Sequence, residues 1–190
     1  MSDGATRSTT NPAARGASRD AQAAEGSVSS GGEGAKYVFV AVIAILIVIL
    51  DQVTKLWVAA DMRLHQSIPI FDGWFDLTYV RNTGAAFSML ADLPEAIRIP
   101  FFVVVAIVAG GAILYFVHQT PRTQRTVLLA CAFVLGGAVG NLIDRLAYGE
   151  VIDFLDVYWD DWHWPAFNVA DSFISVGVVL LLGNALFSKE

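Results

Sequence analysis

The chain has 190 residues, of which 55% are hydrophobic, and its mean hydropathy is +0.56. A soluble domain of this size is usually only about 45–50% apolar, so the composition favours a membrane protein. The formal net charge of −6 argues against nucleic acid as a partner. A single cysteine, Cys131, excludes an intramolecular disulfide, and the three scattered histidines argue against a zinc site.

The first 35 residues form a tail that is rich in Gly, Ser, Ala and Thr and almost free of large apolar residues. Such a composition cannot bury enough apolar surface to fold, so we expect residues 1–35 to be disordered. The tail also lacks the short apolar core of a secretory signal peptide. We expect the folded domain to cover residues 36–188.

Four long apolar segments follow the tail, each of roughly 18–23 residues. At about 1.5 Å per residue, such a helix spans the hydrocarbon core of a bilayer, which is about 30 Å thick. A buried helix of a soluble bundle would show a polar face, and residues 37–50 have none. The sequence therefore predicts an all-α membrane protein with four transmembrane helices, at about 37–59, 97–117, 126–147 and 170–187.

The basic residues predict how the helices are oriented. Arginine and lysine concentrate in the tail and in the connection 118–125, whereas the segments 60–96 and 148–169 hold ten of the eighteen acidic residues. The positive-inside rule then places both termini in the cytoplasm and these two acidic segments outside it.

The two acidic segments are expected to differ in structure. Residues 68–81 alternate partly and are rich in aromatic and β-branched residues around Asp72-Gly73, which predicts a small β-rich extracytoplasmic segment, a strand pair on the membrane surface. Residues 148–169 are interpreted as an acidic, aromatic loop. All five tryptophans fall near the predicted outer interface, where indole rings are preferred.

Polar residues of three predicted helices share one depth near the outer side. Helical spacing places them on common faces, because residues three and four apart are neighbours on a helix. They are Asp51 and Lys55 in the first helix, Asn141, Asp144 and Arg145 in the third, and Asn168, Asp171, Ser172 and Ser175 at the start of the fourth.

The residues by themselves leave structural roles open for each of these positions. The pairs Asp51–Lys55 and Asp144–Arg145 are equally well explained as charge pairs that lock the bundle. The two asparagines are suited to interhelical hydrogen bonds, and Asp171 to a helix cap. Asp153, in the acidic loop, resembles an ordinary surface carboxylate. The small residues Gly136, Gly137 and Gly140 predict close helix packing, and Cys131 is expected to be a small core residue.

Five blocks of the sequence resemble signal peptidase II, the lipoprotein signal peptidase family. They occur in the family's order, without a departure at the polar positions, and the resemblance covers residues 36–187. The blocks are DQVTK at 51–55, NTGAAF at 82–87, GGAVGNLIDR at 136–145, VIDFLD at 151–156 and FNVADS at 167–172.

The resemblance implies an aspartyl endopeptidase in the bacterial cytoplasmic membrane. Such an enzyme removes the signal peptide from diacylglyceryl-modified prolipoproteins, cutting just before the lipidated cysteine, and its other contacts are membrane lipids. The resemblance implies that Asp153 and Asp171 are the catalytic pair, without a metal or an organic cofactor. We expect Asp171 to ionise more readily, because a helix N-terminus favours its charge.

The resemblance also implies a shell of supporting polar residues. Four of them, Asn82, Asn141, Arg145 and Asn168, are expected to contribute directly to the site. The complete shell is Asp51, Lys55, Asn82, Asn141, Asp144, Arg145 and Asn168.

Two other functions remain as alternatives. A small transporter or proton-conducting protein would use the intramembrane charges as a relay, although the cytoplasmic halves of the helices are apolar and no paired broken helices are evident. A non-enzymatic scaffold would use the polar cluster to specify helix packing, and would leave Asp153 and Asp171 without a role.

Overall fold

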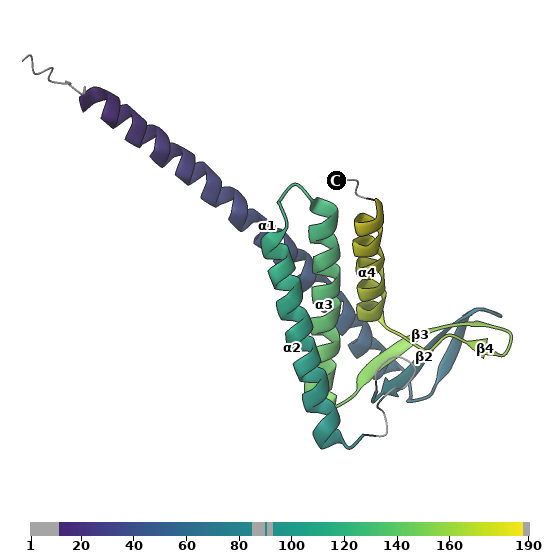
Figure 1. Cartoon of the computed structure of the whole chain (residues 1–190). Helices are drawn as coiled ribbons and strands as arrows, with labels where there is room; N and C mark the ends of the chain where they lie inside the picture. The colour runs from purple at the N-terminus through teal and green to yellow at the C-terminus, as the bar shows by residue number, and fades with distance from the viewer. Residues whose placement is uncertain (1–11, 85–89, 91–92, 188–190) are drawn as a thin grey trace, which may run out of the picture.

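The computed structural model describes residues 12–84, 90 and 93–187, and in it four helices form a bundle with a small sheet at one end (Figure 1). The helices are long and apolar enough to cross a membrane, α1 over its part from Glu33 onward. This confirms the four predicted helices, with slightly wider bounds for the last three. They are α1 (Pro12–Asp61), α2 (Glu95–Gln119), α3 (Arg125–Tyr148) and α4 (Val169–Phe187).

The first helix begins well before the predicted span. It starts at Pro12 and projects away from the bundle, so that it includes part of the tail for which composition predicts disorder (Figure 1). Each glycine inside a helix costs about 1 kcal/mol relative to alanine, which disfavours a helix in this glycine-rich stretch. Disorder of residues 1–35 stays a prediction, and residues 1–11 lie outside the described part of the chain.

The third helix is the centre of the bundle, because it contacts α1, α2 and α4. Its glycines allow the close approach: a Cβ on Gly136 would lie 2.9 Å from the carbonyl oxygen of Ala44 in α1, and a Cβ on Gly137 would lie 2.7 Å from Ile174 in α4. This confirms the predicted role of the small residues. Cys131 is fully buried in the core of the bundle, also as predicted.

The sheet is antiparallel, in the order β1-β2-β3-β4. Its first two strands form a hairpin whose turn contains Gly73 at a φ of +90°, which confirms the strand pair predicted at 68–81. The strands are β1 (Ser67–Phe71), β2 (Phe75–Asn82), β3 (Val151–Trp159) and β4 (Trp162–His163).

The interpretation of residues 148–169 as a loop is wrong, because β3 occupies their centre. This strand pairs with β2 over most of its length, with Asp153 opposite Val80. Its β-branched and aromatic residues, such as Val151, Ile152 and Tyr158, are typical of a strand. Asp153 therefore lies on a strand that is held in register and not on a flexible connection.

A second core joins the sheet to the bundle. Ile152 and Phe154 of β3 pack there against Val58 and Met62 of α1 and against Tyr79 of β2. Burial of these apolar side chains on either side of Asp153 fixes the position of the strand relative to the helices. The sheet thus holds Asp153 against the ends of α3 and α4.

Candidate active site

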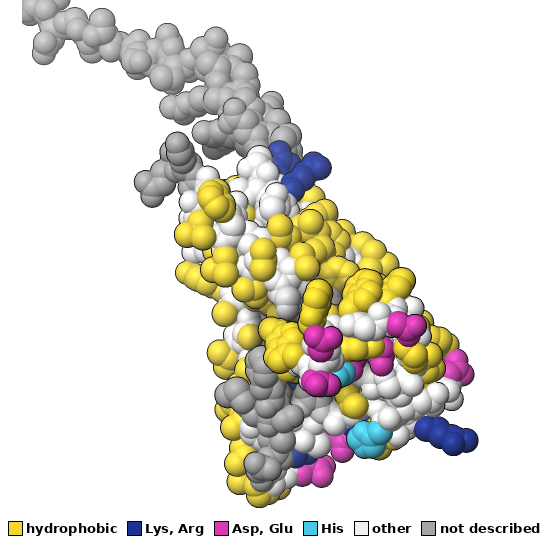
Figure 2. Space-filling model, turned by 90° about the vertical axis from the view of Figure 1, so that its right-hand side faces the viewer, with side chains coloured by type: hydrophobic (Ala, Val, Ile, Leu, Met, Phe, Trp, Pro, Cys, Tyr) yellow, Lys and Arg dark blue, Asp and Glu magenta, His cyan; other side chains and the backbone are white. Residues whose placement is uncertain are grey.

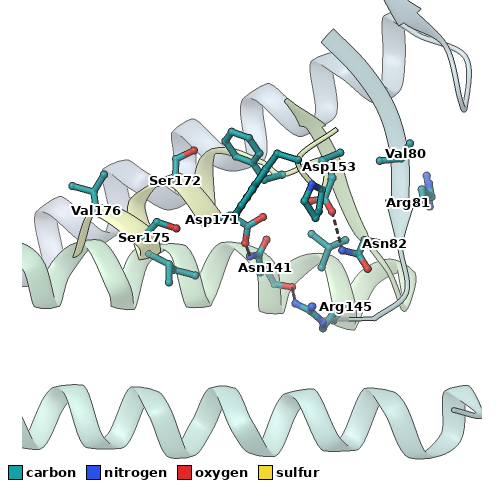
Figure 3. Close-up of a pocket in the computed structure, with 16 residues that line it drawn as sticks. Val80, Arg81, Asn82, Asn141, Arg145, Asp153, Asp171, Ser172, Ser175 and Val176 are labelled. Atoms are coloured by element: carbon teal, nitrogen blue, oxygen red, sulfur yellow. Dashed lines mark hydrogen bonds between the residues drawn. The ribbon is translucent and has the colours of Figure 1, made fainter. Parts of the chain in front are cut away.

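A cavity of about 740 Å³ lies where the sheet meets the ends of α3 and α4 (Figure 3). Most of the residues expected to contribute directly to a site line it. Its polar side chains are Arg81, Asn82, Asn141, Arg145, Asp153, Asp171, Ser172 and Ser175, and its apolar walls include Val80, Trp164, Phe167, Ile174 and Val176.

Asp153 is a buried carboxyl group, with 2% of its surface exposed. Its two oxygens accept hydrogen bonds from the side-chain amides of Asn82, at 3.0 Å, and Asn168, at 2.7 Å. Burial, and secondly the negative charge of Asp171, raise the pKa of Asp153 from 3.8 to about 7. These properties exclude an ordinary surface carboxylate, which was one of the readings that the sequence left open.

Asp171 lies in the first turn of α4 and has two roles. Its Oδ2 accepts a hydrogen bond from the backbone N–H of Asn168, at 3.3 Å, while its own N–H donates to Asn168 Oδ1 at 2.9 Å. This reciprocal pair is a capping box. Its other oxygen, Oδ1, accepts a hydrogen bond from Asn141 at 2.8 Å at the edge of the cavity (Figure 3). The predicted cap is therefore present, and it leaves one carboxylate oxygen on the cavity side.

Asn141 and Asn168 connect the two carboxyl groups. Asn168 donates to Asn141 Oδ1 at 3.1 Å as well as to Asp153, and Asn141 donates to Asp171. The two asparagines thus make the inter-element hydrogen bonds that the sequence suggested. The same bonds orient both amides toward the carboxyl groups of the cavity.

Lys55 ties the supporting carboxylates together in the interior. Its ammonium group lies 2.8 Å from Asp51 and 3.0 Å from Asp144, and all three side chains are almost completely buried. Asp51 also accepts the backbone N–H of Ala170 at 2.9 Å, and Asp144 accepts that of Ile152 at 3.1 Å. Ala170 directly precedes Asp171, and Ile152 directly precedes Asp153. The buried charges of Lys55, Asp51 and Asp144 therefore fix the backbone next to both carboxyl groups of the cavity.

The sequence left open a charge pair between Asp144 and Arg145, and the structure shows another arrangement. Within the described residues the ion-pair partner of Asp144 is Lys55, because adjacent residues of a helix point in different directions. Arg145 donates instead to the carbonyl oxygens of Gly84, at 3.1 Å, and Asn141, at 3.4 Å. Its guanidinium group also lies 4.2 Å from the ring centre of Phe102.

Two contributions were missed by reasoning from the sequence. Gln52 donates to Asp144 at 2.9 Å and to the carbonyl oxygen of Gly140 at 3.2 Å, so it joins α1 to α3. Gln52 lies within the DQVTK block, next to Asp51, and this position in the sequence was the signal that could have identified it. Arg81 lines the cavity from β2 and stacks near the ring of Tyr148. Residues 85–87 of the NTGAAF block lie outside the described residues.

The sequence and the fold match one family. A family model described as signal peptidase (SPase) II matches residues 43–187. The chain is 55% identical over 133 residues to a lipoprotein signal peptidase of Geobacter sulfurreducens, covering 70% of this chain and 82% of the relative. It is 47% identical over 145 residues to one of Syntrophus aciditrophicus, covering 76% and 90%.

A solved structure agrees with these matches. It is described as a bacterial membrane enzyme determined by the in meso method at 2.3 Å resolution, and it superposes with a TM-score of 0.70 at 33% identity, covering 80% of this chain and 92% of that one. The family match covers α2, α3, α4 and the part of α1 from residue 43 onward, and it includes every polar residue of the cavity. The chain therefore belongs to the signal peptidase II family.

Proposed function

We propose that this protein is a membrane aspartic endopeptidase that removes the signal peptide from diacylglyceryl-modified prolipoproteins, just before the lipidated cysteine. The observation that carries the proposal is that Asp153 and Asp171 face one cavity, each held by an asparagine amide. The relatives named lipoprotein signal peptidase support the substrate class.

Two neighbouring carboxyl groups that share a proton can hydrolyse a peptide bond. The raised pKa of Asp153 favours the protonated form at this position, and Asp171, which accepts a hydrogen bond from Asn141, is the proposed general base. Asp171 then takes a proton from the attacking water while Asp153 gives its proton to the carbonyl oxygen. When the tetrahedral intermediate collapses, Asp171 gives its proton to the departing amine and the C–N bond breaks. The proton on the former carbonyl oxygen returns to Asp153.

The remaining residues of the cavity fit a lipidated peptide. The amides of Asn82 and Asn168 orient Asp153, and the guanidinium group of Arg145 offers donors for a peptide carbonyl or an oxyanion. The wall formed by Phe167, Ile174 and Val176 is apolar. Val176 is 48% exposed on the outside of α4, which favours entry of an apolar chain from the bilayer.

The proposed location is the bacterial cytoplasmic membrane, with both termini in the cytoplasm and the sheet on the outer side. Support comes from the distribution of charged and aromatic residues. Arg122 and Arg125 lie at the end of the bundle away from the sheet, whereas Trp159, Trp162 and Trp164 are exposed on or beside the sheet. Labelling of single introduced cysteines from either side tests the orientation, and labelling of residues 160–163 from the cytoplasm would overturn it.

A cleavage assay tests the activity. Detergent-solubilised protein is incubated with a diacylglyceryl-modified prolipoprotein, and the shortened product is followed by gel electrophoresis. Asp153→Asn and Asp171→Asn should each lower the rate at least about 100-fold, the lower range for general acid–base groups. Asp156→Asn is the matched control, because Asp156 lies on the same strand but pairs with His163 at 3.0 Å, away from the cavity.

The outcomes separate the proposal from its alternatives. Undiminished cleavage by either active-site variant would contradict the assigned pair. A folded wild-type protein without any cleavage would favour the transporter, which proton flux in proteoliposomes would then test.

A further inference from the structure

A second cavity, of about 700 Å³, lies at the opposite end of the bundle from the sheet, between α1 and the connection from α2 to α3. Three basic residues and two large apolar ones line it: Lys36, Arg122, Arg125, Phe39 and Leu128. We propose that this basic cavity binds the headgroup of one anionic membrane phospholipid. The two arginines would contact the phosphate, and Phe39, which is 37% exposed, would lie beside the first methylene groups of the acyl chains.

Lys36 builds the floor of the basic cavity. It is only 4% exposed, and its ammonium group donates to the carbonyl oxygens of His118, at 2.9 Å, and Thr120, at 3.2 Å. It also pairs with Glu33 at 2.8 Å. Its charge is therefore used to hold α1 against the carboxyl end of α2, where a cation is favourable. Lys36 shapes the cavity but is not the group available to a ligand.

The two arginines are the available cations. Both are exposed, and within the described part of the chain neither guanidinium group makes a hydrogen bond or an ion pair. A guanidinium group presents paired donors that match the oxygens of a phosphate. Among the described residues, three cations line the cavity and one anion, Glu33, lies beside it on Lys36, although the whole chain carries a net charge of −6. The cavity is therefore locally positive although the protein as a whole is negative, and it favours an anionic ligand.

The depth of the basic cavity favours a lipid over a free anion. Arg125 is the first residue of the span Arg125–Tyr148, and Lys36 lies in the first turn of the span that begins at Glu33. The arginines therefore lie where an apolar span ends, which is the level of lipid headgroups. Figure 2 shows dark-blue basic side chains at this end of the apolar surface and no magenta acidic ones beside them, whereas the other end carries both kinds.

The start of α3 adds to the positive potential. Its N-cap residue, Gln124, makes no side-chain hydrogen bond to the helix, so the amides of the first turn are not capped by it. The helix dipole there favours a negative charge. A lipid is favoured by the two arginines beside the exposed ring of Phe39, and lipid binding does not depend on the peptidase activity.

Lipid binding can be measured on the full chain in detergent. Native mass spectrometry with phosphatidylglycerol and with phosphatidylcholine of the same acyl chains gives the stoichiometry and the relative affinity. We expect one phosphatidylglycerol molecule to bind more tightly than phosphatidylcholine. At about 1 kcal/mol for each basic residue near a lipid surface, two arginines give a preference of about 30-fold.

Variants locate the binding. Arg122→Gln with Arg125→Gln should abolish the preference, and the corresponding double lysine variant should retain an intermediate preference, because it keeps the charge without the paired donors. Arg63→Gln is the matched control, since Arg63 is an exposed arginine at the sheet end of the bundle and should leave the preference unchanged.

Three results of the comparisons between lipids and between variants would overturn the proposal. They are equal binding of the two lipids, wild-type preference in the double glutamine variant, and a lysine variant no better than the glutamine variant. Displacement of the lipid by excess inorganic phosphate would also overturn it, because the basic cavity would then select a free anion and not a lipid.

Discussion

Lys55 donates a hydrogen bond to the side-chain oxygen of Asn141 at 2.9 Å, and this contact decides which way the amide of Asn141 faces. With Oδ1 occupied by Lys55 and by Asn168, the nitrogen of Asn141 must point to Asp171, to which it donates at 2.8 Å. A lysine that does not line the cavity thus controls a donor to one of the two proposed catalytic carboxyl groups.

Replacement of Lys55 by methionine should strongly destabilise the fold. The variant leaves Asp51 and Asp144 buried without their cation, which typically costs about 3–5 kcal/mol when one partner of a buried pair is removed. Thermal unfolding in detergent measures the loss, with Arg63→Gln as an exposed control. An unfolding temperature equal to that of the wild type would show that the cluster does not support the fold.

The activity should fall as the pH rises through about 7. Asp153 has a pKa raised from 3.8 to about 7, so it holds the proton needed for general acid catalysis below that pH and loses it above. The value of kcat/KM should therefore decline about tenfold for each pH unit on the alkaline side. A profile that stays flat from pH 6 to pH 9, with chemistry shown to be rate-limiting, would contradict this assignment.

Removal of the Asn82 amide should move this alkaline limb to higher pH. The hydrogen bond from Asn82 favours ionised Asp153 and so lowers its pKa, and Asn82→Ala removes this effect. The pH profile of kcat/KM measures the displacement. Ser67→Ala, which removes a hydrogen bond to Asp76 elsewhere in the sheet, should leave the limb in place. A shift to lower pH in Asn82→Ala would reverse the proposed role of the amide.

Gly137→Ala should disturb both stability and activity. The added Cβ would lie 2.7 Å from Ile174 and closer still to the carbonyl oxygen of Ala170, so α4 must move, and Asp171 with it. Overpacking of this kind costs about 1–3 kcal/mol. Gly111→Ala in α2 is the control, because in the described residues nothing lies within 4 Å of its added Cβ. Equal unfolding temperatures and equal rates for both variants would exclude the proposed packing constraint.

Arg145→Lys should lower kcat/KM by about 10- to 100-fold, corresponding to the roughly 1.5–3 kcal/mol of a charged hydrogen bond. The planar guanidinium group reaches Gly84 and Asn141 at once and stacks on Phe102, which an ammonium group cannot reproduce. The kinetics with the lipidated substrate measure the effect, while the unfolding temperature checks that the bundle is intact. Full activity in this variant would remove Arg145 from the site.

The amino-acid sequence by itself determined the four apolar spans, because the length and hydropathy of a span follow from local composition. Helical spacing also placed Asp51 and Lys55 on one face, and the structure confirms their pair at 2.8 Å. The hairpin at 68–81 was predictable for the same reason, since its alternation and its Asp-Gly turn are local signals.

Only the tertiary structure decided which carboxyl group is buried and what each polar residue contacts. In the sequence Asp153 looks like the other acidic residues around it. It becomes buried because β3 pairs with β2, and this pairing places Asn82 beside it, although the two residues are 71 positions apart in the chain. Asp144 forms its ion pair with Lys55 of α1 and not with its sequence neighbour Arg145. Burial and partner choice depend on contacts between distant segments, and a local pattern does not encode them.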